Sequence, residues 1–308
     1  MKVSDDPALS PRSLKTKNRR RSNRWGRKQA SARSEPSAPG QRAARTTPVR
    51  MYWWGGGSVG YNFGDELSPI VVKALSGRDV QRAPLPRAEL LAIGSILQIA
   101  AKTSRLAKRT APLWVWGSGT LAPVNFPEFP CLTVSAVRGP LTRNMLRLKA
   151  DLPIGDPGLL ADRLVPRPVT KRYAWGVIPH HSHVDSDFVR RLLENTPRST
   201  LIDVRQPDVL STISKMADCD RIASTSLHGL VVADSFHIPN IWISAPGERR
   251  TFSWKFTDYF LSVGRSLFQP IQVARTYNLD DIEETENFAY FSDIETVKSR
   301  IAAAFPDL

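Results

Sequence analysis

Short apolar runs alternate with amphipathic segments along the chain from Met51 onward. Apolar runs bounded by turn residues predict buried strands, and apolar residues three or four positions apart predict helices between them. The expected strands are Met51–Trp54, Leu90–Ile93, Leu113–Trp116, Leu132–Ala136, Ala174–Ile178, Ser199–Ile202, Arg221–Ser224 and Asn240–Ile243. The expected helices lie near Glu66–Ser76, Pro140–Leu148, Ser186–Asn195, Pro207–Ala217, Leu227–Phe236 and Ile294–Ala304.

Strands separated by helices are typical of βαβ units, so the pattern predicts an α/β fold with parallel sheets. A proline-rich break at Leu164–Thr170 divides the elements into two sets. We therefore expect two Rossmann-like domains facing each other across a cleft, an N-terminal one at 51–165 and a C-terminal one at 171–308 that ends in a helix. In such folds ligands bind at the carboxyl ends of the strands.

Residues 1–50 lack this pattern and differ from the rest of the chain in charge. They hold 14 of the 43 basic residues and 3 of the 29 acidic residues, which leaves a net charge of only +3 for the remainder. A segment rich in charge, Ser, Pro and Ala cannot bury enough apolar surface to fold, so we expect a disordered basic tail. Its basic run Lys15–Lys28 is typical of nucleic-acid or anionic-lipid binding. A merely solvated extension, or a translation start at Met51, is the alternative.

Composition further narrows the class of protein to which the chain can belong. Two cysteines, Cys131 and Cys219, exclude a disulfide framework and a cysteine-rich zinc site. The longest apolar stretch, Leu90–Ala101, is shorter than the roughly 20 residues that a membrane span needs. We expect a cytoplasmic protein, with peripheral contact at a membrane surface left open.

A glycine-rich loop follows the first expected strand. Gly55–Gly60 fits G-x-G-x-x-G, and Asp79 lies at a plausible distance for a ribose contact. However, Tyr61–Gly64 intervene before the helix, so we favour a flexible loop that lets backbone approach a ligand. Asn62 and Asp65 then lie near the N-terminus of the helix; Asp65 as a plain helix cap is the alternative.

An arginine, Arg138, directly follows another strand and precedes Gly139 and Pro140. Proline favours the first turn of a helix, which places Arg138 at the carboxyl end of the strand. There its planar guanidinium suits a carboxylate or phosphate. An ordinary surface arginine is the alternative.

A third strand leads into a helix through Ser226, Leu227 and His228. Hydroxyls and unpaired backbone N–H groups at a helix start can bind phosphate. His228 in the first turn can act as general acid or base, and a core histidine is the alternative.

Three histidines, His180, His181 and His183, follow the strand at Ala174–Ile178. Apart from Asp185 they have no nearby ligand partners and no zinc-site spacing, so we expect no metal. His180 is expected to line the cleft instead. The absence of G-x-S-x-G and Walker A sequences weakens hydrolase and P-loop interpretations.

Taken in order, seven short motifs between Met51 and Phe260 resemble the polysaccharide pyruvyl transferase family. Its bacterial exopolysaccharide ketal pyruvyltransferases of the succinoglycan type look most similar. The motifs are Asn62–Leu67, Gly94–Ser95, Gly117–Gly119, Ala136–Pro140, Ile154–Pro157, Gly176–His180 and Ser226–Gly229.

The resemblance implies a glycosyltransferase-B-like fold, phosphoenolpyruvate as co-substrate and no cofactor. It also implies an acceptor sugar, on an oligosaccharide or a lipid-linked oligosaccharide, that becomes a ketal. Contact of the tail with the inner membrane surface is suggested by its charge alone. Carried onto this sequence, the resemblance makes His228 the catalytic acid and Arg138 part of the catalytic site, and it puts Asp65 near the acceptor or the donor. It assigns donor binding to Arg138, Ser226, Leu227, His228 and Lys255, and the acceptor or cleft to Asn62 and His180. From the chemistry of ketal formation, our hypothesis is that Asp65 is the catalytic base for a hydroxyl.

Two other functions stay open from the sequence. A sugar-nucleotide glycosyltransferase of the same shape would need a ribose carboxylate, for which Asp234 or Glu248 is available. A nucleic-acid-binding protein would rely on the basic tail and bind more weakly as salt rises. The nearly neutral remainder and the lack of a recognisable reader motif disfavour it.

Overall fold

A computed structural model describes residues 47–55, 61–166, 170–245, 247, 253–265, 269–273, 278–282 and 293–308. Most of the expected tail, Gly56–Gly60 of the glycine loop and Glu248 therefore lie outside the described residues. Residues 45–308 pack as one unit. The division of this unit into two domains at the proline-rich break stays a prediction.

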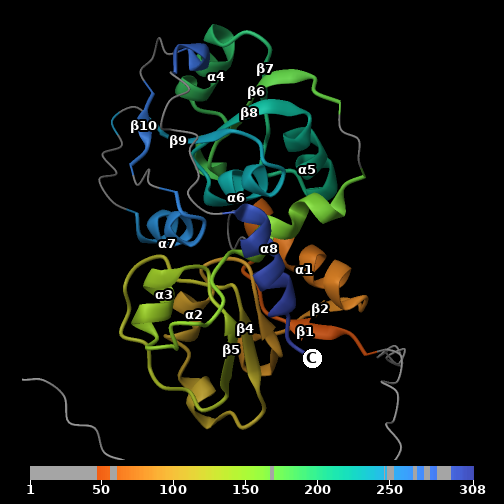
Figure 1. The fold of residues 1–308 in the computed structure, drawn as a ribbon, viewed down its shortest axis with the longest axis vertical. Coiled ribbons are helices and arrows are strands. Elements are labelled where there is room, and N and C mark those ends of the chain that lie inside the picture. Colours follow the sequence, from red (N-terminus) through yellow and green to blue (C-terminus); the bar gives the residue numbers. More distant parts are fainter. Residues whose placement is uncertain are drawn as a thin grey trace, which may run out of the picture. The chain divides into compact units, whose positions relative to one another are not determined.

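The first sheet has five parallel strands in the order β2-β1-β3-β4-β5 (Figure 1). Its helices follow the strands in sequence, as in βαβ units. The strands are β1 (Val49–Met51), β2 (Val80–Arg82), β3 (Leu90–Leu91), β4 (Leu113–Trp116) and β5 (Leu132–Ala136). The helices are α1 (Phe63–Ser76), α2 (Leu97–Ala100) and α3 (Pro140–Met145), with 3-10 helices η2 (Leu85–Arg87) and η3 (Ser104–Lys108).

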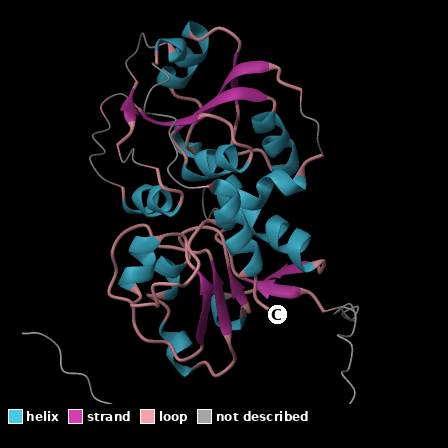
Figure 2. Cartoon of the chain, viewed as in Figure 1, coloured by secondary structure: helices cyan, strands magenta, loops and turns pink. Residues whose placement is uncertain are grey.

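The second sheet also has five parallel strands, in the order β10-β9-β8-β6-β7. The 3-10 helix η4 (Pro157–Leu164) precedes it. Its strands are β6 (Tyr173–Ile178), β7 (Ser199–Leu201), β8 (Cys219–Ser224), β9 (Asn240–Ser244) and β10 (Ile271–Gln272). The remaining helices are α4 (Asp187–Asn195), α5 (Val209–Ala217), α6 (Leu227–Ser235), α7 (Trp254–Ser262), α8 (Ile294–Ala303), η5 (His181–His183) and η6 (Leu279–Asp281). Figure 2 shows the strands as two groups with helices around them. The expected α/β class with parallel sheets is confirmed.

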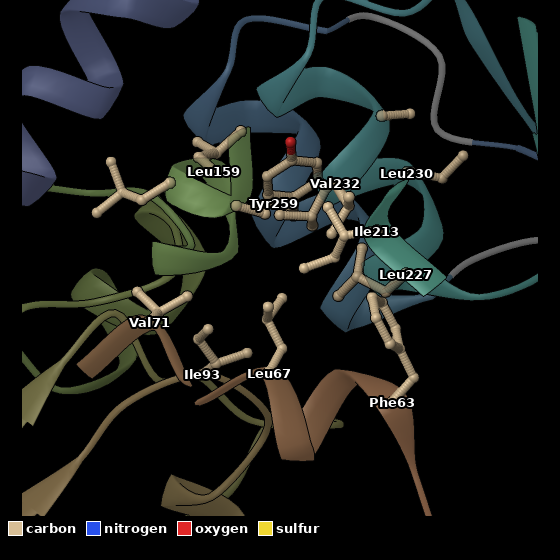
Figure 3. Close-up of a cluster of buried hydrophobic side chains, with 14 of the residues drawn as sticks. Phe63, Leu67, Val71, Ile93, Leu159, Ile213, Leu227, Leu230, Val232 and Tyr259 are labelled. Atoms are coloured by element: carbon tan, nitrogen blue, oxygen red, sulfur yellow. The ribbon is translucent and has the colours of Figure 1, made fainter. Parts of the chain in front are cut away.

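A shared apolar core joins elements of both sheets (Figure 3). Leu67 and Val71 from α1 belong to the same buried cluster as Leu159 from η4 and Leu230 from α6. Each of these side chains is at most 1% exposed. Because burial of such a side chain stabilises the fold by roughly 1.5–3 kcal/mol, the cluster fixes α1, η4 and α6 against one another.

The ends of α1 are set by local chemistry. Asn62 is its N-cap, and its side-chain oxygen accepts a hydrogen bond from the backbone N–H of Gly64 at 3.1 Å. Gly77 closes the helix in the left-handed conformation, at φ 66°, and its N–H donates to the carbonyl of Lys73. The helix therefore begins three residues before the expected Glu66, and Asp65 is not its cap.

Several element boundaries differ from the prediction. The first strand begins at Val49 rather than Met51, because the fully buried Val49 pairs with Val80 of β2. The edge strands β2 and β10 were not expected, since neither buries a run of apolar side chains. The helix α7 was also not expected, although Phe256, Tyr259, Phe260 and Val263 follow a helical period.

The last described segment returns to the first sheet (Figure 1). The Trp116 indole N–H donates to the carbonyl of Ile301 in α8 at 2.9 Å, and the Phe305 ring packs edge-on against Trp116. Lys298 on α8 pairs with Asp162 of η4 at 2.9 Å. Among the described residues, no helix combines the length and apolar character needed to cross a bilayer.

Candidate functional site

A cavity of about 450 Å³ lies where residues that follow strands of both sheets meet. Trp54, Ser95, Leu121 and Arg138 line it after β1, β3, β4 and β5. From the second sheet, the lining residues after β6, β7 and β8 are His180, His181, Val204, Ser226, Leu227 and His228. Because carboxyl ends of parallel strands share one edge of a sheet, the topology gathers these residues.

Every residue that the sequence analysis assigned to the site lines this cavity. Helix α1 contributes its cap and its first turn, and α7 contributes a lysine from its first turn. The residues are Asn62, Asp65, Arg138, His180, Ser226, Leu227, His228 and Lys255. Their placement in one cavity is observed, whereas their individual roles stay predictions.

The His228 side chain lies between η4 and α1. Its Nε2 lies 3.7 Å from Oδ2 of Asp156, which caps η4 and is fully buried. On the other side it touches Gly64 of α1, where an added Cβ would lie 1.8 Å from Nδ1. Only a residue without a side chain leaves room for the imidazole at this point.

Asp65 is a buried carboxyl, 8% exposed, in the first turn of α1. Burial raises the pKa of Asp65 to about 6, and the positive charges of His228 and Lys255 partly oppose that increase. One carboxylate oxygen lies against Gly94, at 2.8 Å from where a Cβ would be. A carboxyl that titrates near neutral pH suits proton transfer.

Arg138 is fully buried, so it is not an ordinary surface arginine. Its Nε donates to Asp258 of α7 at 3.2 Å, and its Nη2 donates to the carbonyl of Thr120 at 2.7 Å. Its Nη1 donates to the hydroxyl of Ser95 at 3.1 Å. Much of the guanidinium is thus engaged with the protein, and a direct contact with a ligand stays a prediction.

The start of α6 meets the cavity at Ser226, Leu227 and His228. The Ser226 side chain makes no capping hydrogen bond. The hydroxyl of Ser224 is used internally and accepts from the backbone N–H of Ser226 at 2.9 Å. The hydroxyl of Thr225 accepts from the backbone N–H of His180 at 2.6 Å. Of these three hydroxyl residues, Ser226 is the one that lines the cavity.

The neighbouring histidines lie close together. The rings of His180 and His181 are 3.9 Å apart, and Nδ1 of His180 lies 2.8 Å from the hydroxyl of Ser182. Burial, then the charges of His183 and Lys255, lower the pKa of His181. In the part of the chain that the structure describes, no group of three or more His, Cys, Asp or Glu residues is placed to hold a metal ion.

Two of the three carboxylates considered for a nucleotide, Asp79 and Asp234, do not line this cavity. Asp79 is exposed and pairs with Lys73 at 2.8 Å. Asp234 is buried and accepts hydrogen bonds from Tyr259, at 2.6 Å, and from Asn240. The third carboxylate, at Glu248, lies outside the described residues.

Two buried carboxylates near the site were given no role in the sequence analysis. Asp156 belongs to the motif Ile154–Pro157, where an aspartate before proline indicates only a cap. Asp258 lies three residues after Lys255 on α7, and the helical period would have placed both on one face. Neither their burial nor their partners can be inferred from sequence spacing.

Fold and site together define an α/β protein with a charged cavity at strand ends, where an imidazole, a carboxyl and an amine meet. The family model described as "Polysaccharide pyruvyl transferase" matches residues 62–245, which is more than half of the chain. The chain therefore belongs to that family. The resemblance drawn from the seven motifs is therefore confirmed.

Two relatives share extended similarity with the chain. It is 27% identical to the succinoglycan biosynthesis protein ExoV of Rhizobium meliloti (strain 1021), over 70% of this chain and 65% of that protein. It is 32% identical to the uncharacterized protein L143 of Acanthamoeba polyphaga mimivirus, over 42% of this chain and 47% of that protein. The chain thus spans about half to two thirds of these relatives.

Proposed function

We propose that the protein transfers a pyruvyl group from phosphoenolpyruvate to two hydroxyls of one sugar, in an exopolysaccharide or its lipid-linked precursor, and forms a ketal. The observation that carries this proposal is the convergence of His228, Asp65 and Lys255 on one cavity. Membership of the family and the similarity to a succinoglycan biosynthesis protein support it. The proposed reaction needs phosphoenolpyruvate as co-substrate and no cofactor.

The donor carries a carboxylate and a phosphate, so its site needs two anion-binding features. The first-turn N–H of Leu227 together with the hydroxyl of Ser226, and the ammonium of Lys255, provide them. Arg138 adds positive charge to the same wall while its hydrogen bond to Asp258 fixes the first turns of α7 against β5.

The chemistry follows from the polarity of the donor. His228 protonates the methylene carbon, and the adjacent carbon becomes electrophilic. A sugar hydroxyl attacks that carbon while Asp65 accepts the hydroxyl proton. The C–O bond to phosphate then breaks and phosphate leaves. The second hydroxyl adds and passes its proton to the neutral imidazole of His228, which closes the ketal and restores the acid. General acid–base assistance of this kind contributes about 10²–10⁴-fold to a rate.

The same proposal covers the setting of the reaction. The two sheets would act as the two Rossmann-like halves of a glycosyltransferase-B-like arrangement, with donor and acceptor between them. Asn62 and His180 would face the acceptor. A cytoplasmic protein that touches the inner membrane surface would reach a lipid-linked acceptor.

The test measures phosphate release from phosphoenolpyruvate with and without a free or lipid-linked oligosaccharide. We expect acceptor-dependent release by the wild type and its loss in His228→Ala. His237→Ala is the matched control, because His237 is a surface histidine paired with Glu295 at 2.8 Å. Absence of release with every acceptor, together with binding of a sugar nucleotide, would overturn the proposal.

A further inference from the structure

Asp156 carries a buried carboxylate of which only one oxygen is used by the backbone. Oδ1 accepts from the N–H of Gly158 at 2.9 Å and so caps η4. Oδ2 is buried and has no hydrogen-bond partner. An unpaired buried carboxylate oxygen costs free energy unless a positive charge or a donor reaches it.

The atom that faces this oxygen is itself buried without a hydrogen bond. Nε2 of His228 lies 3.7 Å from Oδ2, which is ion-pair distance and longer than a hydrogen bond of about 2.7–3.2 Å. A small rotation of the ring would close that gap. Both atoms lack a hydrogen-bond partner. A protonated Nε2 can donate a hydrogen bond, and Oδ2 can accept it.

The position of the ring is restricted from both sides. Asp156 faces its Nε2 edge, and Gly64 of α1 touches the atoms around Nδ1. The other charged groups around His228 are Asp65 on α1 and Lys255 on α7. Because Nε2 has no contact with solvent, Nδ1 is the ring nitrogen left to reach a molecule in the cavity.

We propose that Asp156 is a positioning residue, which holds a proton on Nε2 of His228 and presents Nδ1 to the donor. This inference rests on the proposed function for its kinetic consequence. The neutral ring then carries hydrogen on Nε2, and protonation adds the second hydrogen on Nδ1. The hydrogen on Nδ1 is the one transferred to the methylene carbon, while the negative charge of Asp156 stabilises the imidazolium before transfer.

The kinetic test compares the wild type with Asp156→Asn and Asp156→Ser. Both variants keep an oxygen that can cap η4, and both remove the charge that faces His228. We expect kcat to fall about tenfold or more, with little change in KM for phosphoenolpyruvate.

Asp162→Asn is the matched control. Asp162 lies in the same 3-10 helix, but its carboxylate pairs with Lys298 at 2.9 Å. Its loss should lower stability and leave kcat in place. A folded Asp156 variant with an unchanged kcat would overturn the inference.

A second measurement needs neither variant nor turnover. Nitrogen-15 NMR of the wild type reports which ring nitrogen of His228 carries hydrogen in the neutral state. Hydrogen on Nε2 supports the inference, and hydrogen on Nδ1 overturns it. This readout separates failure of the Asp156 inference from failure of the proposed reaction, because it stays informative when no phosphate is released.

Discussion

Replacing Asp65 by asparagine should stabilise the protein and remove its activity at once. The pKa of Asp65 is raised from 3.8 to about 6, mainly by burial. At about 1.36 kcal/mol per pH unit, keeping this carboxyl ionised in the native state costs on the order of 3 kcal/mol above pH 6. Asparagine has nearly the same shape and carries no charge, so it avoids that cost.

The sign of the effect depends on pH. Between about pH 4 and 6 the native state binds a proton more readily than the unfolded state, so this group lowers stability as pH rises. The gain from Asp65→Asn should therefore be small near pH 4 and reach up to about 3 kcal/mol at pH 7. Urea unfolding at several pH values measures the difference in free energy.

Activity and stability should move in opposite directions. If Asp65 accepts the hydroxyl proton, Asp65→Asn loses about 10²-fold or more in kcat. Asp79→Asn is the control, because Asp79 is exposed and the hydrogen bond from Lys73 lowers its pKa. A stability gain that is the same at every pH would refute the pKa argument, and full turnover would remove Asp65 as the base.

Three further substitutions test the rest of the site. Gly64→Ala places a Cβ 1.8 Å from Nδ1 of His228, so the ring must move by more than an ångström and kcat should fall about 10²-fold. Gly77→Ala is the control: nothing lies within 4 Å, so it should keep kcat, although its left-handed φ of 66° makes alanine lower stability. Equal rates for both variants would contradict the geometry. Asp258→Asn leaves the buried Arg138 beside a neutral partner. The free energy of unfolding, measured by urea denaturation, should fall by up to about 3–5 kcal/mol. An unchanged value would show that the ion pair contributes little to stability. Lys255→Met should raise KM for phosphoenolpyruvate. It should also move the acid limb of the pH profile of kcat to higher pH, because the charge of Lys255 lowers the pKa of Asp65. An acid limb that stays in place would refute that coupling.

Sequence pattern predicted the strands whose apolar residues form a run or alternate with polar ones. The bounds of the inner strand β4 agree with the prediction because it is an apolar run bounded by turn residues. The bounds of the edge strand β5 also agree, because apolar and polar residues alternate along it. The edge strand β2 has one partly buried position in three and gives no such signal.

Most of the site was predictable for a topological reason, because these residues follow an expected strand or open an expected helix beside one. Lys255 lies on the unexpected helix α7 and was assigned from the family resemblance alone. The pairing of Asp156 with His228 was not predictable, because it depends on how η4 packs against α6. The engagement of Arg138 by Asp258 likewise joins residues 120 positions apart in the chain.

The return of α8 to the first sheet has a consequence for how the chain is made. Phe305 packs on Trp116, and Phe305 and Leu308 contact the shared apolar core. A ribosome synthesises the strands of the first sheet long before it adds these residues. The first sheet therefore stays without part of its covering while the second sheet is translated, and its packing is completed only once α8 has emerged. During synthesis the first half of the protein thus depends on residues that are added long after its own strands.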